Sequence, residues 1–145
     1  EQFGKTNIRM VPVGNGMNHL FAINEALTTG QILSMTADRR FGSEKAVPCN
    51  SFGAEALFPM GPFATVIQRD VPTLVVLVVK TGTRSYHAVV KRLPMPEAHL
   101  PRKERIALLA QAYANELENV VRQYPEQWFN FFNIWTTTTC QNPKQ

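Results

Sequence analysis

His19 and Glu25 are the first residues in this sequence whose types could do chemistry together. A histidine oriented by a carboxylate can act as a general base and take a proton from an alcohol. On a regular helix, however, residues six positions apart lie about 120° apart around the axis, with roughly 9 Å of rise between them. That separation exceeds hydrogen-bond reach, and the position before Glu25 is Asn24 rather than an acid. We therefore expect His19 to lie on a helix flank and not to act as a base.

Asp38, Arg39 and Arg40 directly follow the apolar segment at residues 31–37. If that segment is a strand, the three polar residues lie at its carboxyl end, where open α/β sheets usually bind ligands. An arginine guanidinium can hold a phosphate through two parallel hydrogen bonds. We therefore predict that these three residues contact substrate, and the alternative is a solvated loop with local ion pairs.

A turn at Pro59, Gly61 and Pro62 precedes a predicted helix. Glycine lets the backbone approach a ligand closely, and proline suits the first position of a helix. The backbone N–H groups at such a helix start can bind an anion. We predict that Pro59, Gly61 and Phe63 contact substrate. Phe58 and Phe63 could line an apolar groove, although aromatics that flank a turn more often belong to the core. The alternative is a turn and two core aromatics that serve only the fold.

The other reactive residue types do not form a recognisable site. Cys49 and Cys140 lie far apart, without a Cys-x-x-Cys motif or a Cys/His cluster, which argues against a zinc site or a disulfide scaffold. His87 and His99 are expected to be structural or exposed, and Ser51 has no nucleophile signature. We therefore expect no metal, no cofactor and no covalent intermediate.

The chain is modestly basic, with 15 Lys and Arg against 11 Asp and Glu and a formal net charge of +4. Such an excess suits an anionic lipid surface or an acidic carrier protein, and the alternative is a solubilising surface without a partner. Nucleic acid is not an expected partner, because no basic stripe is interleaved with stacking aromatics. The most apolar run, at residues 73–79, is far shorter than the roughly 20 residues of a membrane-spanning helix.

Hydrophobic spacing predicts the elements that position these residues. Apolar residues recur at helical spacing over residues 17–29, and Gly30 is placed to end that helix. Residues 8–13 and 31–37 are predicted to be strands, the first of them at a sheet edge because it contains Pro12.

The remaining chain is predicted to continue this alternation. We expect an extended segment at 46–53, helices at 62–69 and 102–123, and strands at 73–80 and 85–93. The strand at 73–80 is continuously apolar, so both of its faces are expected to be covered in the centre of a sheet. The predicted fold class is α/β, a mixed sheet with helices on both faces.

The C-terminal segment is dense in aromatics, with five between Trp128 and Trp135. Such a segment either packs onto the sheet or lies at a bilayer interface, where indole rings are favoured. We expect core packing, because the segment lacks a clean amphipathic face. The expected organisation is one domain at residues 1–135 and a polar tail at 136–145.

Taken in order, these motifs resemble the C-terminal portion of the bacterial lipid A biosynthesis acyltransferases, late acyltransferases of the lysophospholipid acyltransferase superfamily. The motifs are Gly30, Asp38, Val47-Pro48 with Phe52-Gly53, Pro59 with Gly61, the apolar run at 73–79, and the closing segment Tyr124-Pro125-Glu126-Gln127-Trp128. The resemblance extends from about Met10 to Trp135. Each motif is common alone, but their order together with the closing segment is fairly specific.

The resemblance implies that a hydroxyl of a lipid A precursor attacks the thioester of an acyl carrier protein or acyl-CoA. It places the reaction at the cytoplasmic face of the inner membrane, with the protein peripheral or anchored by an N-terminal segment missing from this chain. The family's His-x4-Asp/Glu pair belongs to an earlier turn. We therefore expect that pair upstream of Glu1, and this piece to lack it and to be inactive alone.

One departure from the superfamily limits the acceptor. Relatives that acylate glycerol phosphate have Glu-Gly-Thr-Arg in the turn where this chain has Met60-Gly61-Pro62-Phe63, which disfavours a glycerol phosphate acceptor. Two alternatives stay open. The chain could be a non-catalytic α/β domain that binds a lipid or a carrier protein, or part of an acyltransferase that acts on an aminolipid or a glycerophospholipid.

Overall fold

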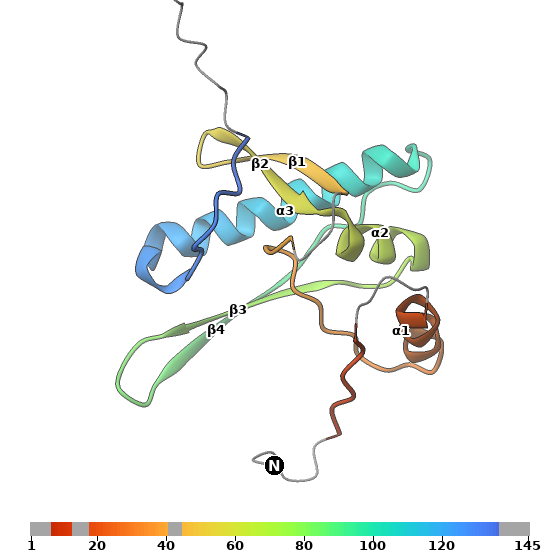
Figure 1. Cartoon of the computed structure of the whole chain (residues 1–145), viewed down its shortest axis with the longest axis horizontal. Coiled ribbons are helices and arrows are strands. Elements are labelled where there is room, and N and C mark those ends of the chain that lie inside the picture. The colour runs from red at the N-terminus through yellow and green to blue at the C-terminus, as the bar shows by residue number, and fades with distance from the viewer. Residues whose placement is uncertain (1–6, 13–17, 41–44, 137–145) are drawn as a thin grey trace, which may run out of the picture. The chain divides into compact units, whose positions relative to one another are not determined.

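The computed structural model describes residues 7–12, 18–40 and 45–136. The chain divides into two compact units, Glu1–Met35 and Thr36–Gln145. The first unit contains one helix, α1 (Asn18–Thr28), among its described residues. All the described strands and the other helices belong to the second unit (Figure 1).

Helix α1 ends in a glycine cap, as its sequence predicts. Gly30 has a positive φ of 74°. The Gln31 N–H donates to the Ala26 carbonyl at 2.9 Å, and the Gly30 N–H donates to the Leu27 carbonyl at 3.3 Å. This pair of hydrogen bonds is the Schellman motif, which requires the left-handed conformation that glycine adopts without steric cost.

The two strands predicted near the N-terminus are wrong for the described residues. Residues 8–12 and 31–37 have no strand conformation, and Val13 lies outside the described residues. Apolar alternation becomes a strand only when a second strand satisfies the backbone groups, and neither segment has such a partner. Ile32 is almost fully exposed as a result.

The second unit confirms the α/β class, but its described strands form two separate antiparallel pairs rather than the single mixed sheet expected. β1 (Ala46–Ser51) pairs with β2 (Ala54–Pro59), and β3 (Leu74–Lys80) pairs with β4 (Tyr86–Arg92). The predicted extended segment, the strand in the 73–80 region and its antiparallel neighbour are therefore confirmed. β2 is an additional strand that directly precedes the Pro59 turn.

Helix α3 (Arg102–Gln123) organises this unit and has the bounds that its apolar stripe predicts. It contacts β1, β3, the helix α2 (Met60–Arg69) and the 3-10 turn η1 (Pro125–Gln127). Its buried side is Ile106, Leu109, Ala110, Ala114, Leu117, Val120 and Val121. None of the described helices has the length and hydrophobicity needed to cross a bilayer.

Two glutamine side chains close strand edges in the same way. Gln111 of α3 accepts the Asn50 N–H at 2.8 Å and donates to the Asn50 carbonyl at 2.8 Å. Gln127 of η1 accepts the Lys80 N–H at 2.7 Å and donates to the Lys80 carbonyl at 2.9 Å. Each amide therefore replaces one residue of a neighbouring strand and satisfies an otherwise open edge.

The prediction that the β3 region is covered on both faces is wrong for this structure. Val75 and Val79 are buried, but Leu74, Val76 and Val78 on the opposite face are exposed. A two-stranded pair packed on one side only can bury one of its faces.

Shortening Leu109 should destabilise the fold strongly. Its side chain is 1% exposed in the core under α3, so Leu109→Ala removes buried contacts and leaves a cavity. We expect a loss of about 3 kcal/mol in the free energy of unfolding, measured by urea unfolding and far-UV circular dichroism. The matched control is Leu108→Ala, next to it but 47% exposed, with an expected loss below about 0.5 kcal/mol. Equal losses would contradict this packing.

Candidate functional site

The turn between β1 and β2 is fastened to α3. It consists of Phe52 and Gly53, both with positive φ (55° and 79°), which is the pattern of a type I′ hairpin turn. This conformation is unfavourable for a bulky residue such as Phe52. The Phe52 N–H donates to Glu118 Oε2 at 2.7 Å, and the Arg122 guanidinium carbon lies 5.3 Å from the centre of the Phe52 ring. These contacts offset the strain of the turn.

Glu118 is held in its charged form by this arrangement. The Phe52 N–H lowers the pKa of the Glu118 carboxyl most, and the hydrogen bond from Arg122 adds to this effect. Arg122 Nε lies 3.0 Å from Glu118 Oε1, so the carboxylate accepts from the turn with one oxygen and from Arg122 with the other. Hydrogen bonds that involve a charged partner are about twice as strong as neutral ones.

Phe52 also belongs to an aromatic cluster with Trp128 and Trp135. The Phe52 ring centre lies 5.9 Å from that of Trp128 and 6.4 Å from that of Trp135, and the two indoles meet edge to face at 6.3 Å. Trp135 Nε1 donates to the Ser51 carbonyl at 3.2 Å, and Trp135 forms an isolated bridge with Ala56 of β2. The C-terminal segment is thereby held against the β1–β2 hairpin.

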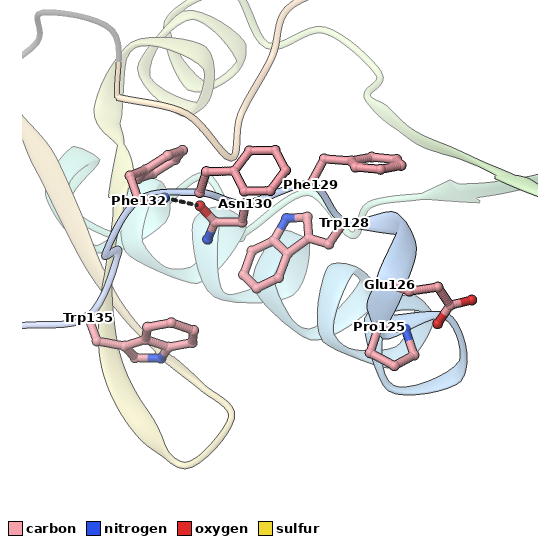
Figure 2. Close-up of a pocket in the computed structure, with 8 residues that line it drawn as sticks. Pro125, Glu126, Trp128, Phe129, Asn130, Phe132 and Trp135 are labelled. Carbon is pink, nitrogen blue, oxygen red and sulfur yellow. Dashed lines mark hydrogen bonds between the residues drawn. The ribbon is translucent and has the colours of Figure 1, made fainter.

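The expectation of core packing for this segment holds for only part of it. Trp128 and Trp135 pack against the core and Ile134 is buried, whereas Phe129, Phe131 and Phe132 are exposed. The exposed rings border a crevice, which we call the aromatic crevice (Figure 2). It has a volume of about 370 Å³ and is lined by Pro125, Glu126, Trp128, Phe129, Asn130, Phe131, Phe132 and Trp135.

Trp128, which lines the aromatic crevice, has a buried polar atom without a partner among the described residues. Trp128 Nε1 has no hydrogen-bond acceptor among the described residues, and in Figure 2 it lies on the side toward Phe129 and Asn130. The Asn130 side-chain oxygen accepts the Phe132 N–H at 3.3 Å. A largely aromatic lining with an unpaired indole N–H beside it suits an apolar ligand that carries an acceptor, such as a carbonyl oxygen.

Asp38 lines a second crevice, of about 150 Å³, which shares Trp128 with the first. We call it the Asp38 crevice; its other walls are Leu77, Val78, Val79, Leu117, Val120, Val121, Tyr124 and Gln127. Arg39 Nε lies 3.8 Å from Asp38 Oδ2, and both side chains are partly buried. The negative charge of Asp38 beside the apolar wall is therefore balanced by the positive charge of Arg39.

Tyr113 connects Asp38 with Phe63. Burial raises the pKa of the Tyr113 hydroxyl, and the negative charge of Asp38 raises it further. The Tyr113 ring centre lies 6.0 Å from that of Phe58 and 5.7 Å from that of Phe63. Phe58 and Phe63 are buried in the core, which is the alternative that the sequence left open for them, and neither lines either crevice.

The structure does not bring the six predicted site residues into one crevice. Asp38 and Arg39 are neighbours, Arg40 is exposed, and Pro59 is buried at the end of β2. Gly61 is exposed in the first turn of α2. That helix start is a weak anion site, because the Met60 N–H donates to the Lys45 carbonyl at 3.1 Å and Pro62 has no N–H. Substrate contact by these residues stays a prediction.

The histidines do not form a catalytic pair among the described residues. Glu25 forms an ion pair with Arg9 at 3.6 Å, and His19 forms no ion pair with Glu25. One His-x4-Glu spacing does occur in the sequence, at His99 and Glu104, which corrects the expectation that the chain lacks it. His99 Nδ1 lies 3.1 Å from Glu97 Oε2 instead, and both side chains are largely exposed.

Three residues of the site make contacts that the sequence did not predict: Glu118, Gln127 and Trp128. Both Gln127 and Trp128 belong to the closing motif, and Trp128 was expected to pack in the core. The sequence did not predict that Gln127 pairs with Lys80 or that Trp128 lines both crevices. Glu118 belongs to no sequence motif. It accepts a hydrogen bond from the Phe52 N–H, 66 positions away in the sequence, and no local pattern predicts that contact. Within the described ranges, no three His, Cys, Asp or Glu side chains converge in a way that could hold a metal ion.

A family model described as bacterial lipid A biosynthesis acyltransferase matches residues 4–137. The match confirms the resemblance seen in the motifs, and it includes the lining residues of both crevices. Among proteins of curated function, none matches this sequence.

The Glu118 contact should make stability depend on pH. The folded-state pKa lies below the ordinary value of 4.5, so the contribution is present above pH 4.5 and is lost as the pH falls through the lowered pKa. We expect Glu118→Gln to cost about 1 kcal/mol at pH 7, with the difference from wild type shrinking in acid. Urea unfolding at several pH values measures it. Glu116→Gln removes the same charge from α3 without this contact, and an equal cost there would contradict the assignment.

The Cys49 thiol should be unreactive in the native protein. Cys49 is buried, and burial raises the pKa of its thiol to about 11. Since the thiolate is the reactive form, a Cys140→Ser variant should react with Ellman's reagent at pH 8 at least about 100-fold more slowly when folded than in guanidinium. Rapid labelling of the folded variant would contradict the buried position.

Proposed function

Because the chain belongs to the bacterial lipid A biosynthesis acyltransferase family, we propose that it takes part in moving a fatty acyl group onto a hydroxyl of a lipid A precursor. The family supports a lipid acyltransferase function, and the match over residues 4–137 is the observation that carries the proposal. The proposed donor is the thioester of an acyl carrier protein or acyl-CoA. The hydroxyl oxygen attacks the thioester carbonyl and forms the ester C–O bond, the C–S bond breaks, and the thiolate leaves and takes up the proton that the hydroxyl lost.

The aromatic crevice is the proposed place for part of the acyl chain. Its walls are largely aromatic, and its volume of about 370 Å³ falls in the range of roughly 300–1,000 Å³ typical of small-ligand sites. The free Trp128 N–H supplies a donor for an ester or thioester carbonyl. These features support a lipid ligand without distinguishing the donor chain from a chain of the acceptor.

Contacts with the polar part of the acceptor are proposed for the predicted residues. Arg39 and Arg40 can pair with phosphate groups, and Asp38 orients Arg39 through their 3.8 Å ion pair. Pro59, Gly61 and Phe63 are proposed to shape the turn at the start of α2, where the Gly61 N–H is the remaining donor for an anion. The reaction needs neither a metal nor a cofactor.

The general base is proposed to lie outside these residues. None of the chain's three histidines lines either crevice, and a base must come within hydrogen-bond reach of the hydroxyl. We place the reaction at the cytoplasmic face of the inner membrane, where the acceptor lipid and the soluble donor meet. Without such a base, the scaffold would act as a non-catalytic domain that binds a lipid or carrier protein.

An acyl-transfer assay tests the proposal. The protein, expressed from its natural reading frame, is mixed with radiolabelled acyl carrier protein or acyl-CoA and with one of three acceptors: a lipid A precursor, a lysophospholipid or an aminolipid. We expect label in the lipid A precursor, and a reduction of at least about tenfold in kcat/KM for an Arg39→Gln, Arg40→Gln double variant, the loss of one bidentate phosphate contact. Transfer only to another acceptor would overturn the proposal that the acceptor is a lipid A precursor. No transfer to any acceptor would favour the alternative, a non-catalytic domain that binds a lipid or carrier protein.

Histidine variants test where the base lies. We expect His19→Ala and His99→Ala to leave any measured transfer rate unchanged, because neither imidazole lies at a crevice. The matched charge control for the arginine pair is an Arg102→Gln, Lys103→Gln double variant, which removes two exposed cations from the start of α3. Loss of turnover in His19→Ala or His99→Ala would overturn this placement of the base.

A further inference from the structure

The β3–β4 hairpin exposes one complete face. Its directly opposed pairs are Leu74 with Arg92, Val76 with Val90, Val78 with Ala88, and Lys80 with Tyr86. Since alternate residues of a strand share a face, these eight side chains form one surface, which we call the hairpin face. All eight are exposed, and the pair extends from the body of its unit as a long ribbon (Figure 1).

The centre of the hairpin face is apolar. Leu74, Val76, Val78, Tyr86 and Val90 are each between 53% and 67% exposed. Single exposed apolar side chains are ordinary, but a contiguous set of this kind marks an interaction surface. The opposite face of β3 packs against its own unit, because Val75 and Val79 are buried there.

The hairpin also carries the whole charge excess of the chain. Residues 71–93 contain Lys80, Arg84, Lys91 and Arg92 and no Asp or Glu. Outside this segment, the Lys and Arg residues equal the 11 Asp and Glu in number, so the formal net charge of +4 lies entirely in the hairpin. None of these four cations forms an ion pair with a described residue.

We propose that the hairpin face docks on an anionic membrane surface. Lys80 lies at one end of the apolar stripe beside Tyr86, and Arg92 lies at the other end beside Leu74. A strand of seven residues spans roughly 23 Å, so the apolar centre enters the interface while both ends reach lipid phosphates. Apolar burial and attraction to anionic lipid act together in such binding.

An acidic protein is a poorer partner for this face. The cations lie at the ends of the stripe, and the Val76–Val90 and Val78–Ala88 pairs between them offer no side-chain hydrogen-bonding group. A bilayer requires none there, whereas transient protein interfaces are as polar as the rest of the surface. The hairpin face adds to the proposed function the surface through which the protein meets the membrane. Only the identity of the lipid acceptor rests on the proposed function.

Vesicle sedimentation tests the proposal with the chain itself. One set of vesicles contains phosphatidylethanolamine and phosphatidylglycerol, and the other contains phosphatidylcholine alone. We expect binding to the anionic set, about 30-fold weaker for a Lys80→Gln, Arg92→Gln double variant, since each cation near the surface contributes about fivefold. A Val76→Ser, Val90→Ser double variant should bind at least about fivefold more weakly.

Matched controls separate docking from general effects. Leu108→Ser removes an exposed apolar side chain from α3, and the Arg102→Gln, Lys103→Gln variant removes two exposed cations; both should bind like wild type. Equal binding to both vesicle sets, unchanged binding by the hairpin variants, or binding only to purified acyl carrier protein would overturn the proposal. Vesicle binding requires no turnover, so its outcome is read separately from acyl transfer.

Discussion

The β1–β2 hairpin keeps its place through the contact between its turn and α3. Phe52 occupies a left-handed conformation that a bulky residue adopts only when its surroundings hold it there. Glu118 accepts its N–H, Arg122 lies over its ring, and Trp128 stacks against it. Because Trp128 also lines both crevices, the same contact that seats the hairpin fixes one wall of the candidate site. Fold and site are therefore coupled through one residue of the turn.

The two strand pairs are joined through helices rather than through each other. β1 and β3 each present an edge to a glutamine amide, Gln111 from α3 and Gln127 from η1. Each amide supplies both a donor and an acceptor, so it satisfies the N–H and the carbonyl at the strand edge as a neighbouring strand would. This explains part of the closing Tyr-Pro-Glu-Gln-Trp segment: Gln127 satisfies the end of β3, and Trp128 packs beside it on the turn of the other hairpin.

The parts of the fold that follow from the sequence are those whose decisive interactions are local. The bounds of α3 follow from its own apolar stripe, and the end of α1 follows from Gly30. The strands predicted at residues 8–13 and 31–37 required partners that their own residues do not specify, and 8–12 and 31–37 lack them. The site shows the same division. Asp38 was predicted to contact substrate from its position after an apolar segment, and it lines a crevice, whereas Glu118 and the free Trp128 N–H depend on contacts between distant parts of the chain.

The sequence contains two tryptophans, and both line the aromatic crevice. Their rings are nearly perpendicular, with an angle of 89° between the planes. The tryptophan emission of the chain therefore originates at one place, beside the candidate site. A molecule that enters the crevice alters the surroundings of both emitting rings, so the protein contains its own optical probe of occupancy and needs no attached dye.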